Sequence, residues 1–252
     1  MYFNVSADAY GRFMGRFSRP LAVLFSEWAG VHSGQTALDV GCGPGALTAV
    51  LIDKLGASSV AAIDPSESFV EAARTRFPDA DVRLGSAEAL PFADDSFDLA
   101  LAQLVVHFMA DPVAGVTEMA RVTRPGGLVA ACVWDHAGDR GPLSTFWRAA
   151  RDLNPAAPDE STLTGTGEGD LEGLFEKVGL RSIQSMTLIA HVAFPTFDDW
   201  WEPFTFGVGP AGAYVGSLDD RQRSDLAAHC AELLPDAPFE IDAMAWAAAG
   251  RV

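Results

Sequence analysis

From residue 36 to residue 134, short apolar runs alternate with longer stretches whose apolar positions recur every three to four residues. The apolar runs predict strands at residues 36–41, 59–64, 81–86, 97–103 and 127–134. Near-continuous apolar strands that are separated by helices are typical of a parallel sheet buried on both faces. The alternation therefore predicts a doubly wound α/β fold.

The stretches between these runs predict helices at residues 46–56, 66–77 and 111–123. The first ends at Gly56, a common residue just past a helix end. We expect the side chain of Ser66 to cap the second. The third opens with Asp111 and Pro112, the preferred residues at an N-cap and at the first helical position.

The regular alternation ends after residue 134. One helix is expected around residues 143–153 and an amphipathic helix at 169–180, followed by strands at 181–194 and 241–252. Residues 195–240 hold an aromatic segment and a polar helix, which we interpret as an insertion between the two late strands. We therefore expect one domain over residues 1–252, made of an N-terminal helical segment (1–35), a core (36–134) and the late strands with their insertion (135–252).

The composition excludes several classes of partner. The chain has 17 basic and 34 acidic residues, a net charge of −17, and such a surface repels the phosphates of nucleic acids. No apolar run reaches the roughly 18 residues needed to span a bilayer, so a membrane partner is not expected. No secretory signal is visible at the N-terminus.

Cysteine and histidine are sparse. Cys42, Cys132 and Cys230 are widely spaced, which excludes a disulfide framework and favours a cytoplasmic location. His32, His191 and His229 have no companion ligands at metal-binding spacing, so we expect no metal site.

The sequence ALDVGCGPGALT joins the first predicted strand to the first helix. Glycines here allow positive φ angles and let a ligand approach the backbone, and the helix N-terminus offers unpaired N–H groups to an anionic group. This position, at the carboxyl end of a strand in an open α/β sheet, is the expected ligand crevice.

Of two nearby carboxylates, Asp39 and Asp64, the first decides which ligand the crevice would take. Gly41, Gly43 and Ala46 also satisfy the dinucleotide pattern GxGxxG/A. Asp39, two residues before the first glycine, would repel a diphosphate and suits a ligand with an ammonium or sulfonium group. Asp64, at the end of the second strand, suits the ribose of either ligand.

These residues resemble the class I S-adenosylmethionine-dependent methyltransferases that act on small molecules, such as quinone-biosynthesis and natural-product enzymes. The resemblance covers residues 36–134. It rests on four motifs in order, ALDVGCGPG (37–45), AAIDPS (61–66), GSAEALPFADDSFDLALAQ (85–103) and RVTRPGG (121–127). It implies a mostly parallel seven-stranded, Rossmann-like sheet whose last strand is antiparallel and lies beside strand five. It also implies that the N-terminal helical segment and the 195–240 insertion cap the site.

The resemblance implies S-adenosylmethionine as the cofactor. The methionine part of the cofactor would lie along Gly41 and Gly43, with Asp39 near its amino group. The main-chain carbonyl of Gln103, at the end of strand four, would meet the same ammonium.

The adenosine end follows from the same resemblance. Asp64 would accept hydrogen bonds from the ribose hydroxyls, with Pro65 and Ser66 beside the adenine. Ser86 and Ala87 fall where the family contacts the adenine edge. The family more often has Asp at the position of Ser86, and a neutral serine anchors the exocyclic amine less strongly.

Few residues are candidates for chemistry. Methyl transfer needs the acceptor held close to the methyl carbon in a dry pocket. His107, four residues beyond Gln103, is a candidate general base or a hydrogen-bonded pocket residue. Tyr10 and Arg16 lie in the basic segment near the N-terminus and are candidates to close over the cofactor carboxylate.

Two other functions stay open. The Tyr-x-x-x-Lys pair of short-chain oxidoreductases cannot form, because Ser6, Met14 and Leu218 follow the three tyrosines at that spacing. An NAD(P)-dependent oxidoreductase is therefore the weaker alternative, beside a cofactor-binding protein without catalysis. The substrate is expected to be a small apolar or aromatic molecule, and a homodimer stays open.

Overall fold

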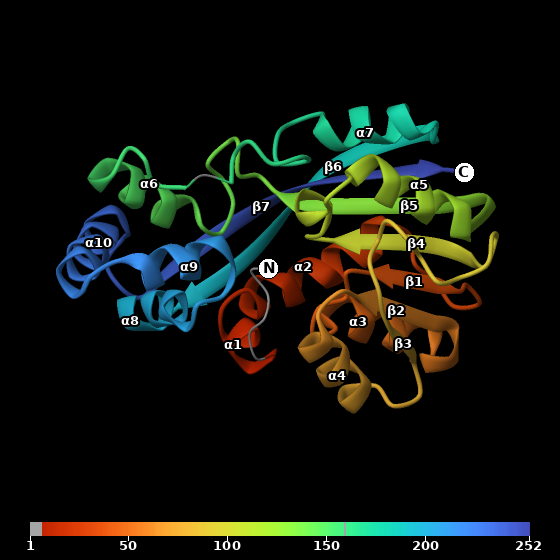
Figure 1. The fold of residues 1–252 in the computed structure, drawn as a ribbon, viewed down its shortest axis with the longest axis horizontal. Helices are drawn as coiled ribbons and strands as arrows, with labels where there is room; N and C mark the ends of the chain where they lie inside the picture. The colour runs from red at the N-terminus through yellow and green to blue at the C-terminus, as the bar shows by residue number, and fades with distance from the viewer. Residues whose placement is uncertain (1–6, 159) are drawn as a thin grey trace.

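The computed structural model describes residues 7–158 and 160–252, so the first six residues of the predicted N-terminal segment lie outside the described part. The strands are β1 (Ala37–Val40), β2 (Val60–Asp64), β3 (Asp81–Leu84), β4 (Phe97–Gln103), β5 (Thr123–Trp134), β6 (Arg181–Phe194) and β7 (Phe239–Arg251). They form one sheet in the order β3-β2-β1-β4-β5-β7-β6, in which β7 is antiparallel to both neighbours (Figure 1). The predicted fold class is confirmed.

The α-helices are α1 (Ala7–Arg12), α2 (Gly15–Trp28), α3 (Ala46–Leu55), α4 (Glu67–Arg76), α5 (Pro112–Val122), α6 (Ser144–Leu153), α7 (Asp170–Val178), α8 (Phe197–Trp201), α9 (Gly209–Ser217) and α10 (Asp220–Leu233). Three short 3-10 helices are η1 (Ala57–Ser59), η2 (Val106–Phe108) and η3 (Glu202–Phe206). The predicted Asp111 cap is confirmed, since its side chain accepts from the Ala114 N–H. The predicted Ser66 cap is wrong, because the Ser66 hydroxyl contacts the Ser68 hydroxyl instead.

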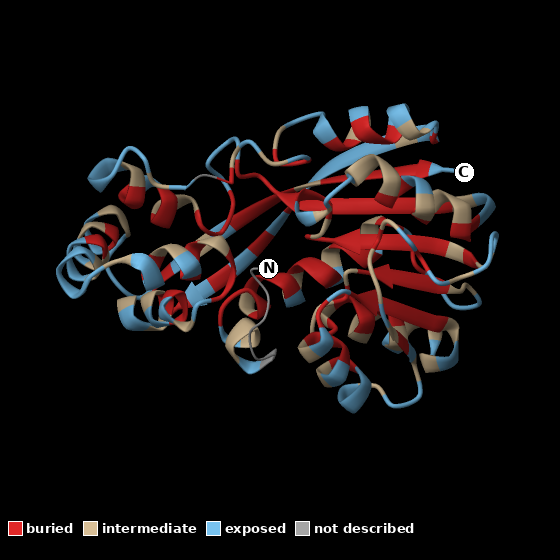
Figure 2. Cartoon of the chain, in the orientation of Figure 1, coloured by how far each residue is buried: buried red, intermediate tan, exposed pale blue. Residues whose placement is uncertain are grey.

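Alternate residues of the central strands face opposite sides of the sheet. In β1, Leu38 and Val40 pack on the side that holds α5 and α7, while Ala37 packs on the side that holds α2 and α3. Both sides are apolar, and Figure 2 shows the strands of this core as the most completely buried part of the molecule. The same alternation turns Asp39, one polar residue within β1, toward α3.

The hairpin of β6 and β7 extends beyond the core and carries a helical cap, formed by α6, α8, η3, α9 and α10 (Figure 1). Four of these elements lie between Phe194 and Phe239, which are paired across the hairpin. The predicted insertion is therefore present. The cap also includes α6, which precedes β6 in the chain and packs against α10.

The N-terminal helices close the molecule between the core and the cap. Helix α2 packs against α3 and β6, with Leu21 and Phe25 fully buried. The Phe13 ring meets Phe204 of η3 edge-on, with centroids 5.0 Å apart. Among the described residues no helix is long and apolar enough to cross a bilayer.

Candidate functional site

The glycine loop after β1 has a backbone that a side chain would disrupt. The N–H groups of Gly41 and Cys42 both donate to the Ile63 carbonyl of β2, at 2.8 and 3.0 Å. Gly41 has φ +70°, and a Cβ there would lie 2.4 Å from the Val105 side chain. Gly43 has φ +53°, with no described atom within 4 Å of its Cβ position. The loop is therefore closed at Gly41 and open at Gly43.

Asp64 holds this loop from the end of β2. Its Oδ2 accepts from the Gly43 N–H and its Oδ1 from the Ser66 N–H, both at 2.8 Å. The carboxylate is 6% exposed. Burial raises the pKa of Asp64, and the two backbone hydrogen bonds oppose that shift. Each oxygen keeps a lone pair for a further donor.

Asp39 is the more deeply buried carboxylate, at 1% exposed. The Thr48 hydroxyl of α3 donates to its Oδ2 at 2.6 Å. The pKa of Asp39 is raised to about 7, mainly by burial and also by the negative charge of Asp64, while the hydrogen bond from Thr48 opposes the shift. A cation beside Asp39 would restore its charged form, whereas a diphosphate would disfavour it.

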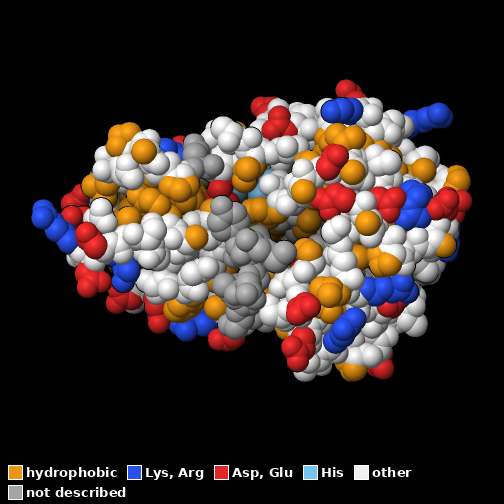
Figure 3. Space-filling view, viewed as in Figure 1, with side chains coloured by type: hydrophobic (Ala, Val, Ile, Leu, Met, Phe, Trp, Pro, Cys, Tyr) orange, Lys and Arg blue, Asp and Glu red, His pale blue; other side chains and the backbone are white. Residues whose placement is uncertain are grey.

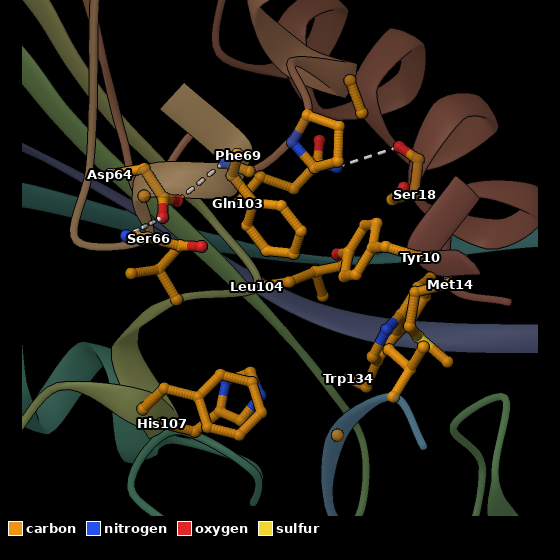
Figure 4. Close-up of a pocket in the computed structure, with 18 of the residues that line it drawn as sticks. Tyr10, Met14, Ser18, Asp64, Ser66, Phe69, Gln103, Leu104, His107 and Trp134 are labelled. Carbon is orange, nitrogen blue, oxygen red and sulfur yellow. Dashed lines mark hydrogen bonds between the residues drawn. The ribbon is translucent and has the colours of Figure 1, made fainter. Parts of the chain in front are cut away.

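Both carboxylates open into one cavity at the carboxyl ends of β1, β2, β4 and β5 (Figure 4). The cavity encloses about 1160 Å³, part of it open to solvent, and is bounded on the far side by the N-terminal helices and the cap. Its position is the expected ligand crevice of an open α/β sheet.

Comparison with known proteins identifies the core. A methyltransferase domain family model matches residues 38–131. The uncharacterized methyltransferase Rv3342 of Mycobacterium tuberculosis is 33% identical over 138 residues, 55% of this chain and 54% of the relative. The demethylmenaquinone methyltransferase of Renibacterium salmoninarum is 32% identical over 145 residues, 58% of this chain and 59% of the relative. Residues 38–131 therefore form a methyltransferase domain of the class I S-adenosylmethionine-dependent type.

The fold of this methyltransferase extends the likeness beyond the core. The YcgJ protein of Bacillus subtilis superposes with a TM-score of 0.60 at 19% identity, covering 91% of this chain and 97% of that one. The matches to the two curated relatives span little more than half of each relative's length. The family uses S-adenosylmethionine as methyl donor. Open space over Gly43, beside the buried carboxylates Asp39 and Asp64, fits such a cationic ligand.

The cavity of the methyltransferase brings together nine of the residues predicted for the site. These are Tyr10, Asp39, Gly41, Gly43, Asp64, Pro65, Ser66, Gln103 and His107. Their common lining of one cavity agrees with the prediction but leaves each assigned contact with the cofactor a prediction.

Three predicted residues do not line this cavity. Arg16 donates to the Asp199 carbonyl at 3.2 Å and lies 5.4 Å from the Phe194 ring centroid, so it joins α2 to the cap. That placement argues against the expected contact with the cofactor carboxylate. Ala87 is buried toward α5, and the Ser86 hydroxyl bonds to Glu88. The chain leaves the sheet edge after β3 ends at Leu84, which turns both residues from the cavity.

Other cavity-lining residues were missed because they come from distant parts of the chain. They include Met14, Phe69, Leu104, Trp134 and Leu143. Leu104 follows β4 with φ +62°, a rare conformation for a branched residue and one that concentrates at functional sites. No sequence signal marks it.

His107 lies on η2 at the cap end of the cavity (Figure 4). Its ring centroid is 3.9 Å from that of Phe108 and 6.0 Å from that of His136. Burial holds the pKa of His107 well below its usual value, and His136 adds to the shift. His107 is therefore neutral at neutral pH.

Local spacing gave His191 no companion ligands, and the structure places two carboxylates beside it. Pairing of β6 with β7 brings His191 Nδ1 within 2.6 Å of Asp242 and 3.6 Å of Glu240. These three side chains could meet at one ion, but all are exposed. The companions lie about 50 residues away in the chain, so local spacing could not reveal them.

Proposed function

We propose that this methyltransferase transfers the methyl group of S-adenosylmethionine to a small apolar or aromatic molecule. The observation that carries the proposal is the single cavity, which joins the Asp39 and Asp64 end to an apolar end beneath the cap. One space can thus hold the donor and an acceptor in contact, as an in-line displacement requires.

The chain's own residues divide the work between the two ends. At the donor end, the buried Asp39 favours a cationic group, and Asp64 both holds the glycine loop and can accept from a ribose. When bound, S-adenosylmethionine would supply an electrophilic methyl carbon for displacement by the acceptor's lone pair, with S-adenosylhomocysteine as the leaving group. The acceptor's proton would leave through the part of the cavity that is open to solvent.

At the acceptor end, apolar side chains of α1, α2 and the cap keep water out. Phe13, Met14 and Leu143 line the cavity and are each less than a tenth exposed. Exclusion of water removes the hydration shell of the reacting groups, and this favours methyl transfer in the site over the same reaction in water. The face drawn in Figure 3 carries dispersed acidic and basic side chains and no continuous basic patch. A surface of this kind does not attract nucleic acid, which agrees with a small-molecule acceptor.

Two measurements test the proposal. Calorimetric titration with S-adenosylmethionine and with NADH should show binding of the first and none of the second. The loaded protein, incubated with a set of phenols, quinols and heteroaromatic amines, should release S-adenosylhomocysteine with at least one. Binding of NADH alone would overturn the family-based assignment of the cofactor, and binding of S-adenosylmethionine without any turnover would favour the non-catalytic alternative.

A further inference from the structure

Several residues that line the cavity carry a buried side-chain polar atom without a hydrogen-bond partner. Six buried side-chain polar atoms have none within the described part of the chain. Four belong to residues that line this cavity, and they are Ser18 Oγ, Gln103 Oε1, His107 Nδ1 and Trp134 Nε1. A buried polar atom without a partner is unfavourable, so such a concentration points to a polar ligand.

The chemistry of two of these atoms is fixed. The Trp134 indole N–H can only donate a hydrogen bond. The Gln103 amide nitrogen donates to the Ser18 carbonyl at 2.9 Å, which leaves the amide oxygen as an acceptor. Gln103, Trp134 and His107 all line the cavity, and Figure 4 shows Gln103 beside Ser18 with Trp134 and His107 further along. The ligand must therefore offer an acceptor to Trp134 and a donor to Gln103.

The charge of the cavity restricts the ligand further. Its described lining includes three carboxyl groups, those of Asp39, Asp64 and Glu160, and no lysine or arginine. Glu160 lies at the cap end, where its Oε2 accepts from the Trp147 indole at 2.7 Å. A carboxylate or phosphate on the substrate would meet this negative field without a cation to pair with.

One common group meets all three conditions. A hydroxyl both accepts and donates, and it is uncharged at neutral pH on most aromatic rings. A ketone would leave Gln103 Oε1 unpaired, and a carboxylate would do the same while adding charge. Aromatic rings among the lining residues, those of Phe13, Phe108 and Trp134, suit an aromatic ligand.

We propose that the cap end of the cavity selects an uncharged, hydroxylated aromatic molecule, with Trp134 Nε1 donating to a substrate oxygen and Gln103 Oε1 accepting from a hydroxyl. This inference rests on the proposed function, because the ligand would be the methyl acceptor. It assigns Trp134 and Gln103 to substrate specificity, which the sequence did not suggest for Trp134.

The first test compares matched ligands on the protein loaded with S-adenosylhomocysteine. The probes are 2-naphthol, 2-naphthoate and naphthalene, followed by ligand-observed NMR and calorimetry at neutral pH. We expect 2-naphthol to bind about tenfold more tightly than either of the others, because only its hydroxyl can both accept from Trp134 and donate to Gln103. Equal affinities, or preference for 2-naphthoate, would overturn the inference.

The second test isolates the indole N–H. Trp134→Phe removes the donor and keeps an aromatic ring, and it should weaken 2-naphthol binding about three- to tenfold without changing the affinity for naphthalene. Trp246→Phe is the matched control, because Trp246 Nε1 is also buried without a partner but lies outside the cavity lining. Equal losses in the two variants would assign Trp134 a packing role only.

The third test supplies the missing cation. Met14 lines the cavity, and Met14→Lys should shift the preference from 2-naphthol toward 2-naphthoate. Affinity for S-adenosylhomocysteine is measured first for every variant and confirms that it is folded. Failure of the wild-type protein to bind S-adenosylhomocysteine would contradict the proposed function, whereas binding it without the expected ligand preference contradicts this inference alone.

Discussion

The carboxylate of Asp64 and the backbone N–H of Gly43 are 2.8 Å apart, so the end of β2 fixes the loop that follows β1. The bond links the two motifs that the sequence placed at a cofactor, 21 residues apart. It gives Asp64 a second task beside any contact with a ribose, since the same side chain sets the path of the backbone beside the ligand.

Asp64→Ala is expected to lower the affinity for S-adenosylmethionine at least about tenfold, because hydrogen bonds to a charged group contribute about 1.5–3 kcal/mol. Calorimetry measures the change. Asp53→Ala, on the exposed side of α3, is the control and should leave the affinity unchanged. Unchanged binding in Asp64→Ala would remove this carboxylate from the cofactor site.

Substitutions of the loop glycines should separate folding from binding. Gly41→Ala combines positive φ with a clash against Val105, so we expect a clear fall in melting temperature. The added methyl group of Gly43→Ala meets open space, so the free energy of unfolding should fall only by the roughly 1–2 kcal/mol that the left-handed conformation costs. Because this methyl group enters the cavity, the variant should lose more in cofactor affinity than in stability. Gly30→Ala, with φ +69° and open space, controls for the backbone term. Equal stability of the Gly30 and Gly41 variants would contradict the clash.

Asp39 should couple cofactor binding to protons. The pKa of Asp39 in the folded protein is about 7, above the ordinary value of 3.8. Between pH 3.8 and pH 7 the folded state therefore keeps a proton on this group that the unfolded state has lost. Stability from this group is therefore highest at low pH and falls as pH rises toward 7. Asp39→Asn, which resembles the protonated form, should gain in melting temperature over the wild type from about pH 5 to about pH 8.

The same carboxyl group should release a proton when a cationic ligand binds. Titrations with S-adenosylmethionine in buffers of different ionisation enthalpy, near neutral pH, measure that release directly. The Asp39→Asn variant should show less of it. A release that is identical in both proteins would place the cation elsewhere.

His107 should act as a neutral pocket residue and not as a strong base. Its lowered pKa disfavours the imidazolium that a base must become. We expect His107→Gln, which keeps a donor near the Nε2 position, to retain turnover within about threefold, a change below 1 kcal/mol, and His107→Leu to lose more. An acidic limb in the pH profile of kcat/KM that disappears in both variants would restore the general base.

Much of the fold was predictable because it depends on local patterns. Apolar runs separated by helical periodicity indicated the parallel core, and Asp111 with Pro112 marked the start of α5. The glycine loop was predictable because its backbone conformation demands specific residues at adjacent positions. Individual hydrogen-bond partners were harder to predict. The Ser66 hydroxyl, for example, contacts the Ser68 hydroxyl and does not cap α4.

The features that were not predictable arise from tertiary placement. Arg16 contacts a cap carbonyl 183 residues away, and His191 meets Asp242 only through the register of β6 with β7. The positive φ of Leu104 accompanies a hydrogen bond from its N–H to the Cys132 carbonyl of β5, at 2.8 Å. The cap end of the cavity, with Trp134, combines segments from both halves of the chain, and no single motif could reveal it.

The pairing of Phe194 with Phe239 has a practical consequence. The chain leaves the hairpin at Phe194 and returns at Phe239, directly opposite. A segment from another protein could therefore replace the inserted helices between these two positions without changing the strands that carry Asp39 and Asp64. Exchanging cassettes between related enzymes at that junction is thus a direct route to altered acceptor choice.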